Sequence, residues 1–232
     1  PTGKGTLDIA FTGRLEDKDS QGLFRQKEGG EWYAFTQFES ISARRAFPAF
    51  DEPGWKVPWT LSLTIPKAMT AVANTPMVRE AAVGTEHKRV EFQTTSPLPS
   101  YLLAFGVGPF DILDGGMAGK TPVRFITPRG RASEATFAAS LTPDILARLE
   151  NYFGMPYPFE KLDVMALPMT LSFGAMENPG LVTFSSLRLL AKPGEESTPF
   201  KRYFVSTQAH ELAHMWFGNL VTMRWWNGLW LN

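Results

Sequence analysis

Two histidines and a glutamate lie within five consecutive residues near the end of the chain, in the order His210-Glu211-Leu212-Ala213-His214. On a helix, side chains four residues apart share a face, with Cβ atoms roughly 5–6 Å apart, so both imidazoles can reach one metal ion. A carboxylate in the same turn can take a proton from the attacking water. The spacing predicts a zinc site for peptide hydrolysis, with His210 and His214 as ligands and Glu211 as general base.

The main alternative for this pentapeptide is a chance occurrence on a polar helix face. The chain has only 3 histidines, which favours the metal site. A metzincin would continue with Gly and His at the positions that Phe217 and Leu220 occupy here, so that class is excluded. Residues 215–232 contain no Asp or Glu. We therefore expect a carboxylate third ligand to follow Asn232 in a longer parent protein, of which this chain is a fragment.

Composition and charge exclude several other classes of function. Lys plus Arg and Asp plus Glu each number 23, and no long basic run occurs, so we expect no nucleic acid and no anionic membrane as partner. No apolar run approaches the ~18 residues of a membrane span. The absence of cysteine rules out disulfides and cysteine-ligated zinc. The first residues do not form a signal peptide, and the sequence leaves the compartment open.

Short alternating runs broken by Gly and Pro predict antiparallel β structure from Thr6 to about Leu113. Glycines cluster in residues 114–120 and disfavour a packed regular element there. We therefore predict an N-terminal β domain, incomplete, over residues 1–113 and a second domain over residues 114–232. The expected strands of the first domain cover residues 7–11, 59–65, 90–94 and 101–107.

The second domain mixes strands and helices. Strands are expected at residues 123–127 and 161–167. A helix is expected over residues 134–153, with a kink or restart at Pro143 and a stop at Gly154. A later helix, opened by Thr198-Pro199, should run to about Phe217 and carry both motif histidines. The pattern is that of an α+β protein.

A second group of residues, Gly174-Ala175-Met176-Glu177-Asn178, follows an expected strand and loop that end at Phe173. By itself this segment reads as an ordinary turn with a solvated glutamate. Its occurrence before the His-Glu-x-x-His helix gives it more meaning.

This pair of motifs resembles the signature of the aminopeptidase N family of zinc aminopeptidases, a gluzincin family that includes leukotriene hydrolase. The resemblance covers nearly the whole chain. Further matching segments are Thr36-Gln37-Phe38-Glu39, Ala43-Arg44-Arg45-Ala46-Phe47-Pro48-Ala49-Phe50-Asp51-Glu52-Pro53, Ser100-Tyr101-Leu102-Leu103-Ala104-Phe105, Tyr157-Pro158-Phe159-Glu160-Lys161-Leu162-Asp163, Gly218-Asn219-Leu220-Val221-Thr222 and Trp225-Trp226-Asn227.

The resemblance implies a fold and a metal site. The fold is an antiparallel β saddle or sandwich, followed by the first part of a thermolysin-like catalytic domain. One zinc ion is implied, with a glutamate directly after Asn232 as its third ligand. The family's oxyanion-stabilising tyrosine also lies downstream. The rest of the parent enzyme is therefore an expected partner of this chain.

The resemblance also assigns substrate contacts. Glu177 and Glu39 hold the free α-amine of a peptide substrate, and the segment Gly174, Ala175 and Met176 lies along the extended substrate backbone. Two carboxylates on one ammonium place the first peptide bond at the metal, which gives exopeptidase specificity. Without the resemblance, Glu39 reads as an exposed strand carboxylate.

The predicted activity is zinc-dependent removal of N-terminal residues from peptides, with residues 1–232 alone nearly inactive. One alternative is a thermolysin-like endopeptidase, which shares the helix motif and needs no amine contact. Another is a non-catalytic binding module of the same fold. Epoxide hydrolysis of the leukotriene type occurs in the family, and no residue here singles it out. Side-chain preference and oligomeric state are not predicted.

Overall fold

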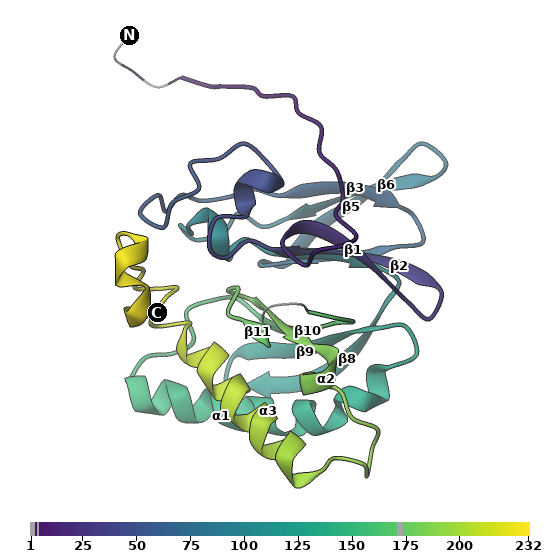
Figure 1. The fold of residues 1–232 in the computed structure, drawn as a ribbon, viewed down its shortest axis with the longest axis vertical. Helices are drawn as coiled ribbons and strands as arrows, with labels where there is room; N and C mark the ends of the chain where they lie inside the picture. Colours follow the sequence, from purple (N-terminus) through teal and green to yellow (C-terminus); the bar gives the residue numbers. More distant parts are fainter. Residues whose placement is uncertain (1–2, 4, 171–173) are drawn as a thin grey trace.

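Three β-sheets and a layer of helices stack on one another (Figure 1). The computed structural model describes residue 3, residues 5–170 and residues 174–232. The first part of the chain forms two antiparallel sheets, and the second part forms a third sheet covered by helices. This arrangement confirms the predicted α+β class.

In the two sheets formed by the first part of the chain, all strands pair antiparallel. Their strand orders are β1-β2-β7-β4 and β3-β6-β5. Apolar side chains including Ile65, Val90 and Phe92 pack between these sheets, so the first domain is the predicted β sandwich. The strands are β1 (Gly22–Glu28), β2 (Glu31–Gln37), β3 (Ser62–Pro66), β4 (Thr70–Ala73), β5 (Met77–Val83), β6 (His87–Phe92) and β7 (Phe105–Gly108).

The third sheet has the order β11-β12-β10-β9-β8 and is mixed. Strand β10 runs parallel to β9 and β12, whereas β8 and β11 pair antiparallel at the edges. Every residue of β10 is buried, as expected for a strand covered on both faces. The strands are β8 (Phe110–Ala118), β9 (Thr121–Pro128), β10 (Leu162–Leu167), β11 (Ala175–Met176) and β12 (Leu181–Ser185).

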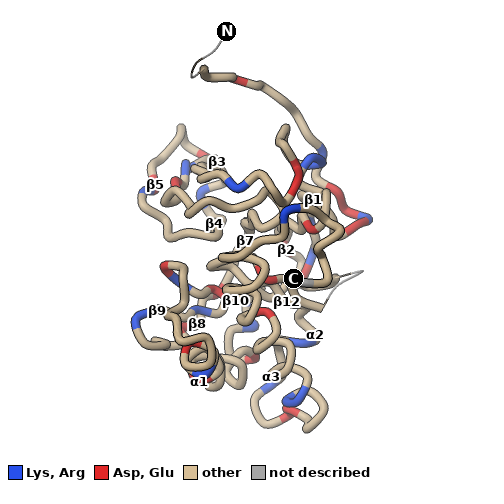
Figure 2. The backbone as a smooth tube through the Cα atoms, turned by 90° about the vertical axis from the view of Figure 1, so that its left-hand side faces the viewer, with Lys and Arg blue, Asp and Glu red and all other residues tan. Residues whose placement is uncertain are grey.

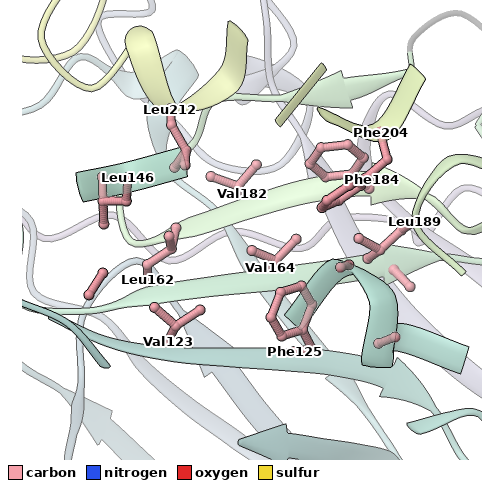
Figure 3. Packing of buried hydrophobic residues seen from close by; sticks show 14 of the residues in the cluster. Val123, Phe125, Leu146, Leu162, Val164, Val182, Phe184, Leu189, Phe204 and Leu212 are labelled. Atoms are coloured by element: carbon pink, nitrogen blue, oxygen red, sulfur yellow. The ribbon is translucent and has the colours of Figure 1, made fainter. Parts of the chain in front are cut away.

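Helices cover one face of this third sheet (Figure 3). Val164 and Val182 of the sheet pack against Leu146 of α1 and against Phe204 and Leu212 of α3. The burial of these apolar side chains fixes α3 on the sheet and thereby places its last turn. The helices are α1 (Thr136–Phe153), α2 (Ser186–Leu189) and α3 (Thr198–Ala213), and the 3-10 helices are η1 (Ala43–Arg45), η2 (Ser100–Leu102), η3 (Ala132–Ala135) and η4 (Trp226–Leu231).

The opposite face of the third sheet meets the four-stranded sheet. Met165 and Leu167 of β10 join Phe24, Phe35 and Val72 in one buried cluster. The two domains therefore share a continuous apolar interface. A separate apolar cavity of about 340 Å³ lies in the β domain, lined among others by Phe38, Trp59 and Phe105.

Several local predictions are confirmed. The strands expected at residues 123–127 and 161–167 correspond to β9 and β10. Those expected at residues 59–65 and 90–94 overlap β3 and β6. Helix α1 ends at Phe153, and Gly154 caps it with the expected left-handed φ of 65°. The helix is continuous through Pro143, so the expected restart there is wrong. The expected strand and loop that end at Phe173 fall partly on residues 171–173, outside the described residues.

Two expected strands are wrong in whole or in part. Residues 7–11 alternate in polarity, but they pair with no strand in the described part of the chain, and Leu7, Ile9 and Phe11 are exposed. The strand expected at 101–107 begins only at Phe105. The preceding backbone instead uses the side chain of Asn74, which bonds Leu102 O and Ala104 N in place of a neighbouring strand.

The glycine cluster at residues 114–120 lies largely inside a strand. Strand β8 continues through it, with an irregularity in pairing between Asp114 and Met117. Gly115 is required there because a Cβ would lie 2.9 Å from the ring of Phe125. The chain leaves the four-stranded sheet after Gly108 and enters the third sheet at Phe110. We therefore propose domain limits of 1–109 and 110–232.

Helix α3 begins at Thr198, as expected, but ends earlier than expected. Its N-cap is Ser197, whose hydroxyl accepts a hydrogen bond from Phe200 N at 3.3 Å. The α-helix ends at Ala213, four residues before Phe217, and His214 is its C-cap. Asn219 N then bonds His214 O, and Gly218 has a φ of +117°, so the chain reverses direction directly after the motif.

Charged residues of both signs are interspersed along the chain (Figure 2). Among the described residues, no helix combines the length and apolarity that a membrane crossing requires.

Candidate functional site

The two motif histidines face each other at the end of α3. Their Nε2 atoms are 3.0 Å apart, and their rings are nearly perpendicular. Two imidazole ligands at Zn–N distances of about 2.0–2.1 Å would lie roughly 3.3 Å apart around a tetrahedral ion. The observed separation is therefore close to what one shared ion requires.

The tautomer of His214 also suits a metal ligand. Its Nδ1 lies 3.1 Å from the backbone oxygen of Phe217. A carbonyl oxygen can only accept, so Nδ1 carries the hydrogen and Nε2 presents its lone pair. Burial, and then the neighbouring His214, lower the pKa of His210 against an opposing effect of Glu177. This favours the neutral imidazole that a metal needs.

Glu211 is buried within the same turn, with 4% of its surface exposed. Burial, followed by the charges of Glu177 and Glu39, raises its pKa to about 9. Ligand atoms of Glu177, Glu211 and His214 all lie within 4.8 Å of one another. Such a group of carboxylates is stabilised in its ionised form by a cation, because a bound divalent ion reverses the local pKa shifts.

Glu177 directly follows the edge strand β11 and is 5% exposed. Asn232 Nδ2 donates to its Oε1 at 2.8 Å, and Asn219 Nδ2 donates to its backbone oxygen at 2.7 Å. Hydrogen bonds thus hold both the side chain and the backbone of Glu177. Its carboxylate faces the same cavity as Glu211.

Glu39 comes from the other domain, two residues after β2 ends. It is half-buried, and burial together with the charge of Glu177 raises its pKa to about 7. Two acidic residues far apart in sequence therefore meet across the domain interface. The shared cavity measures about 270 Å³ and is lined by Glu39, Ala175, Glu177, His210, Glu211, His214, Leu229 and Asn232.

Ala175 presents to this cavity a backbone edge that no other strand of the described residues pairs with. Ser185 N bonds Gly174 O at 2.9 Å, and Met176 pairs with Thr183. In an antiparallel pair, alternate residues bond the neighbouring strand, so the N–H and C=O of Ala175 point away from β12. An extended peptide could pair with this edge.

The other two predicted substrate-contact residues do not line the cavity. Met176 is 2% exposed and packs with Leu98, Tyr101 and Leu102. Gly174 lies beside Tyr203, whose hydroxyl would be 2.9 Å from an added Cβ.

The sequence does not predict the contributions of Asn219, Leu229 and Asn232 to this site. Asn219 belongs to a segment that carries the family resemblance, but no local spacing relates these residues to Glu177. Their proximity arises from the chain reversal after α3.

A His-Glu-x-x-His helix beside the edge strand of a mixed sheet, with a cavity at the histidines, defines the class of His-Glu-x-x-His metallopeptidases. Comparison with known proteins gives the family. Residues 137–232 match the Peptidase family M1 domain, and residues 1–102 match the Peptidase M1 N-terminal domain. Together these matches cover most of the chain, and it belongs to peptidase family M1. Membership of this metallopeptidase family implies a bound metal ion.

Similar proteins are named aminopeptidases. The chain is 42% identical over its whole length to rice (Oryza sativa subsp. japonica) Aminopeptidase M1-D, and spans 27% of that protein. It is 39% identical over 98% of its length to the puromycin-sensitive aminopeptidase of Caenorhabditis elegans, spanning 24% of it. Aminopeptidase N of Acetobacter pasteurianus is 40% identical over 85% of the chain, which spans 55% of that relative.

Proposed function

We propose that the protein containing this chain is a zinc-dependent aminopeptidase that removes N-terminal residues from peptides. The observation that carries the proposal is the meeting of Glu39 and Glu177, from two different domains, in the cavity that holds the histidine pair. The names of the relatives support the same activity.

The histidine pair fits a zinc ion. His210 and His214 would hold it through their facing Nε2 atoms, and we assign the third ligand to a glutamate following Asn232, as the family resemblance implies. When bound, the ion supplies Lewis-acid chemistry, activating a water molecule and polarising the scissile carbonyl.

Glu211 acts as the proton carrier. Its buried carboxylate lies between the histidines in sequence and faces the cavity. It takes the proton from the attacking water and passes it to the leaving amine of the cleaved bond. The burial of Glu211 limits the contact of this transfer with bulk solvent.

Glu39 and Glu177 bind the α-ammonium of the substrate. Burial, and then the negative charge of Glu177, raises the pKa of Glu39 to about 7. Two carboxylates in this position gain most from a cation placed between them. The backbone edge of Ala175 receives the extended peptide beyond its first residue. The ammonium contact sets the register so that the first peptide bond lies at the histidines.

The test uses the full-length, zinc-loaded protein and a short peptide with either a free or an acetylated N-terminus. Mass spectrometry of the products identifies the bonds cleaved. The proposal requires stepwise loss of N-terminal residues from the free peptide and no comparable cleavage of the acetylated one. Internal cleavage of the acetylated peptide would instead identify a thermolysin-like endopeptidase, and no cleavage with no bound zinc would identify a non-catalytic binding module.

A further inference from the structure

The turn that follows Glu177 is held by buried side chains from distant parts of the chain. It runs from Asn178 through Pro179 and Gly180 into β12. Backbone oxygens on both sides of this turn accept hydrogen bonds from side chains. Asn219 bonds the oxygen of Glu177, Asn74 that of Pro179 and Lys161 that of Gly180.

Asn74 belongs to the β domain, directly after β4, and is 6% exposed. Its Nδ2 donates to Pro179 O and to Leu102 O, both at 2.9 Å. Its Oδ1 accepts from Ala104 N at 2.8 Å. Both amide hydrogens are used, so this one side chain joins the β domain to the turn after Glu177.

Lys161 makes a second connection at the same place. Its Nζ donates to Gly180 O at 2.6 Å, to Ala73 O at 2.8 Å and to Asp163 Oδ2 at 2.8 Å. All three ammonium hydrogens are thus satisfied. Lys161 thus links Ala73 to Gly180, and the next residue of the β domain, Asn74, bonds Pro179 directly. Two consecutive residues of the β domain therefore hold two consecutive residues of the turn.

Close packing allows little movement at this contact. A Cβ added at Gly180 would lie 2.0 Å from the backbone oxygen of Asn74, and the φ of Gly180 is +70°. Gly180 N also bonds the hydroxyl of Tyr157 at 3.3 Å. The turn therefore has one position relative to the β domain.

The connection bears on the two carboxylates that meet across the interface. Glu39 follows β2, and Asn74 follows β4, in the same four-stranded sheet with only β7 between them. Glu177 leads directly into the held turn. The distance between the two carboxylates is therefore set by how the turn is fixed to that sheet.

We propose that Asn74, supported by Lys161, is a positioning residue that holds Glu177 at the separation from Glu39 which suits a primary ammonium group. This inference rests on the proposed aminopeptidase function and adds a specificity determinant that contacts neither substrate nor metal. Loss of the Asn74 side chain would loosen the substrate contact while leaving the histidines and Glu211 in place.

The experiment compares Asn74→Ala with Thr75→Val in the full-length, zinc-loaded protein. Thr75 is the matched control, because it is also buried and its hydroxyl donates to Gln93 O at 2.6 Å within the β domain, not to the turn. Steady-state kinetics are measured with L-leucine p-nitroanilide. Asn74→Ala should raise KM about tenfold with kcat changed less than about threefold, whereas Thr75→Val should leave both within about twofold.

A second arm asks whether Asn74 acts through the carboxylate pair. In a Glu39→Gln background the pair is already broken, so Asn74→Ala should add little to KM. A purely structural role predicts that the two effects add. Asn74→Ser, a milder change, should shift KM in the same direction if the alanine variant does not fold.

The outcomes separate the inference from the function on which it rests. A wild-type protein that binds zinc and does not cleave the anilide overturns the proposed function, and the inference with it. An active wild type in which the Asn74 variants match Thr75→Val, or in which the Glu39 and Asn74 effects add, overturns the inference alone.

Discussion

The local sequence determines the relative positions of some side chains in the candidate site but not of others. His210, Glu211 and His214 are brought together by one helical turn, so their spacing alone predicts the facing imidazoles, whose Nε2 atoms are 3.0 Å apart. Glu177 and Glu39 depend on the contact between two domains, which no local pattern encodes. Only the family resemblance indicates a shared role for these two residues.

Glu211→Gln tests the proton carrier at the residue scale. The amide keeps the shape of the carboxylate but cannot take a proton, so kcat should fall by about 10³-fold, within the usual range for a general base. Zinc content should be unchanged, because Glu211 is not assigned as a ligand. Metal analysis and kinetics on the same sample check both. Activity within tenfold of wild type would exclude Glu211 as the base.

At the scale of elements, α3 matters most, because its last turn and the reversal after it build the cavity. Its start could be predicted to within one residue from Thr198-Pro199, since the capping chemistry is local. Its end could not. The helix stops at Ala213 because the backbone then bonds in a different pattern, with Asn219 N on His214 O.

The Ser197 cap should contribute measurably to the stability of α3. Ser197→Ala removes the bond from Phe200 N, recorded at 3.3 Å, and should lower the free energy of unfolding by about 1 kcal/mol. Ser133, whose side chain caps no helix in the described residues, provides a control. Urea denaturation of Ser133→Ala should show a change of less than about 0.5 kcal/mol. Equal losses in the two variants would show that the cap is not used.

Strands, too, depend on tertiary contacts that the local sequence pattern does not contain. The apolar residues 164–167 favour a buried strand, and β10 is buried throughout. Residues 7–11 carry an equally good alternating pattern but lack a partner among the described residues. The glycine cluster lies largely within β8, where Gly115 packs closely over Phe125, a tertiary contact that the local sequence does not predict.

At the scale of the whole molecule, a buried ionic group lies near the domain interface. Asp163 is fully buried and accepts two bonds from Arg124, at 2.8 and 2.7 Å, and one from Lys161 at 2.8 Å. Burial acts to raise its pKa, but Lys161 and Arg124 outweigh this effect and hold the pKa below its ordinary value.

Asp163→Asn should therefore destabilise the protein strongly at neutral pH, by about 3–5 kcal/mol, since Lys161 is left as a buried charge with a weaker partner. A depressed carboxyl pKa stabilises the folded state above the unfolded pKa of about 3.9, and this stability is lost as the pH falls through the folded value. The difference in the free energy of unfolding between wild type and Asp163→Asn should thus shrink below pH ~4.

Chemical denaturation from pH 7 to pH 3 measures this difference. Asp17→Asn, in an exposed pair with Arg25, serves as control and should cost less than about 1 kcal/mol. If wild type stays more stable than Asp163→Asn by the same free energy of unfolding down to pH 3, ionised Asp163 is not the source of that stability.

Both domains enter the proposed function, in which Glu39 from one domain and Glu177 from the other bind the substrate amine. The most direct measurement is the ratio of kcat/KM for L-leucine p-nitroanilide to that for its analogue lacking the α-amine, in full-length wild type and Glu177→Gln. We expect a wild-type ratio of at least about 10³ that falls by at least about tenfold in the variant, with zinc retained. A ratio near one in wild type, or the same ratio in both proteins, would contradict this expectation.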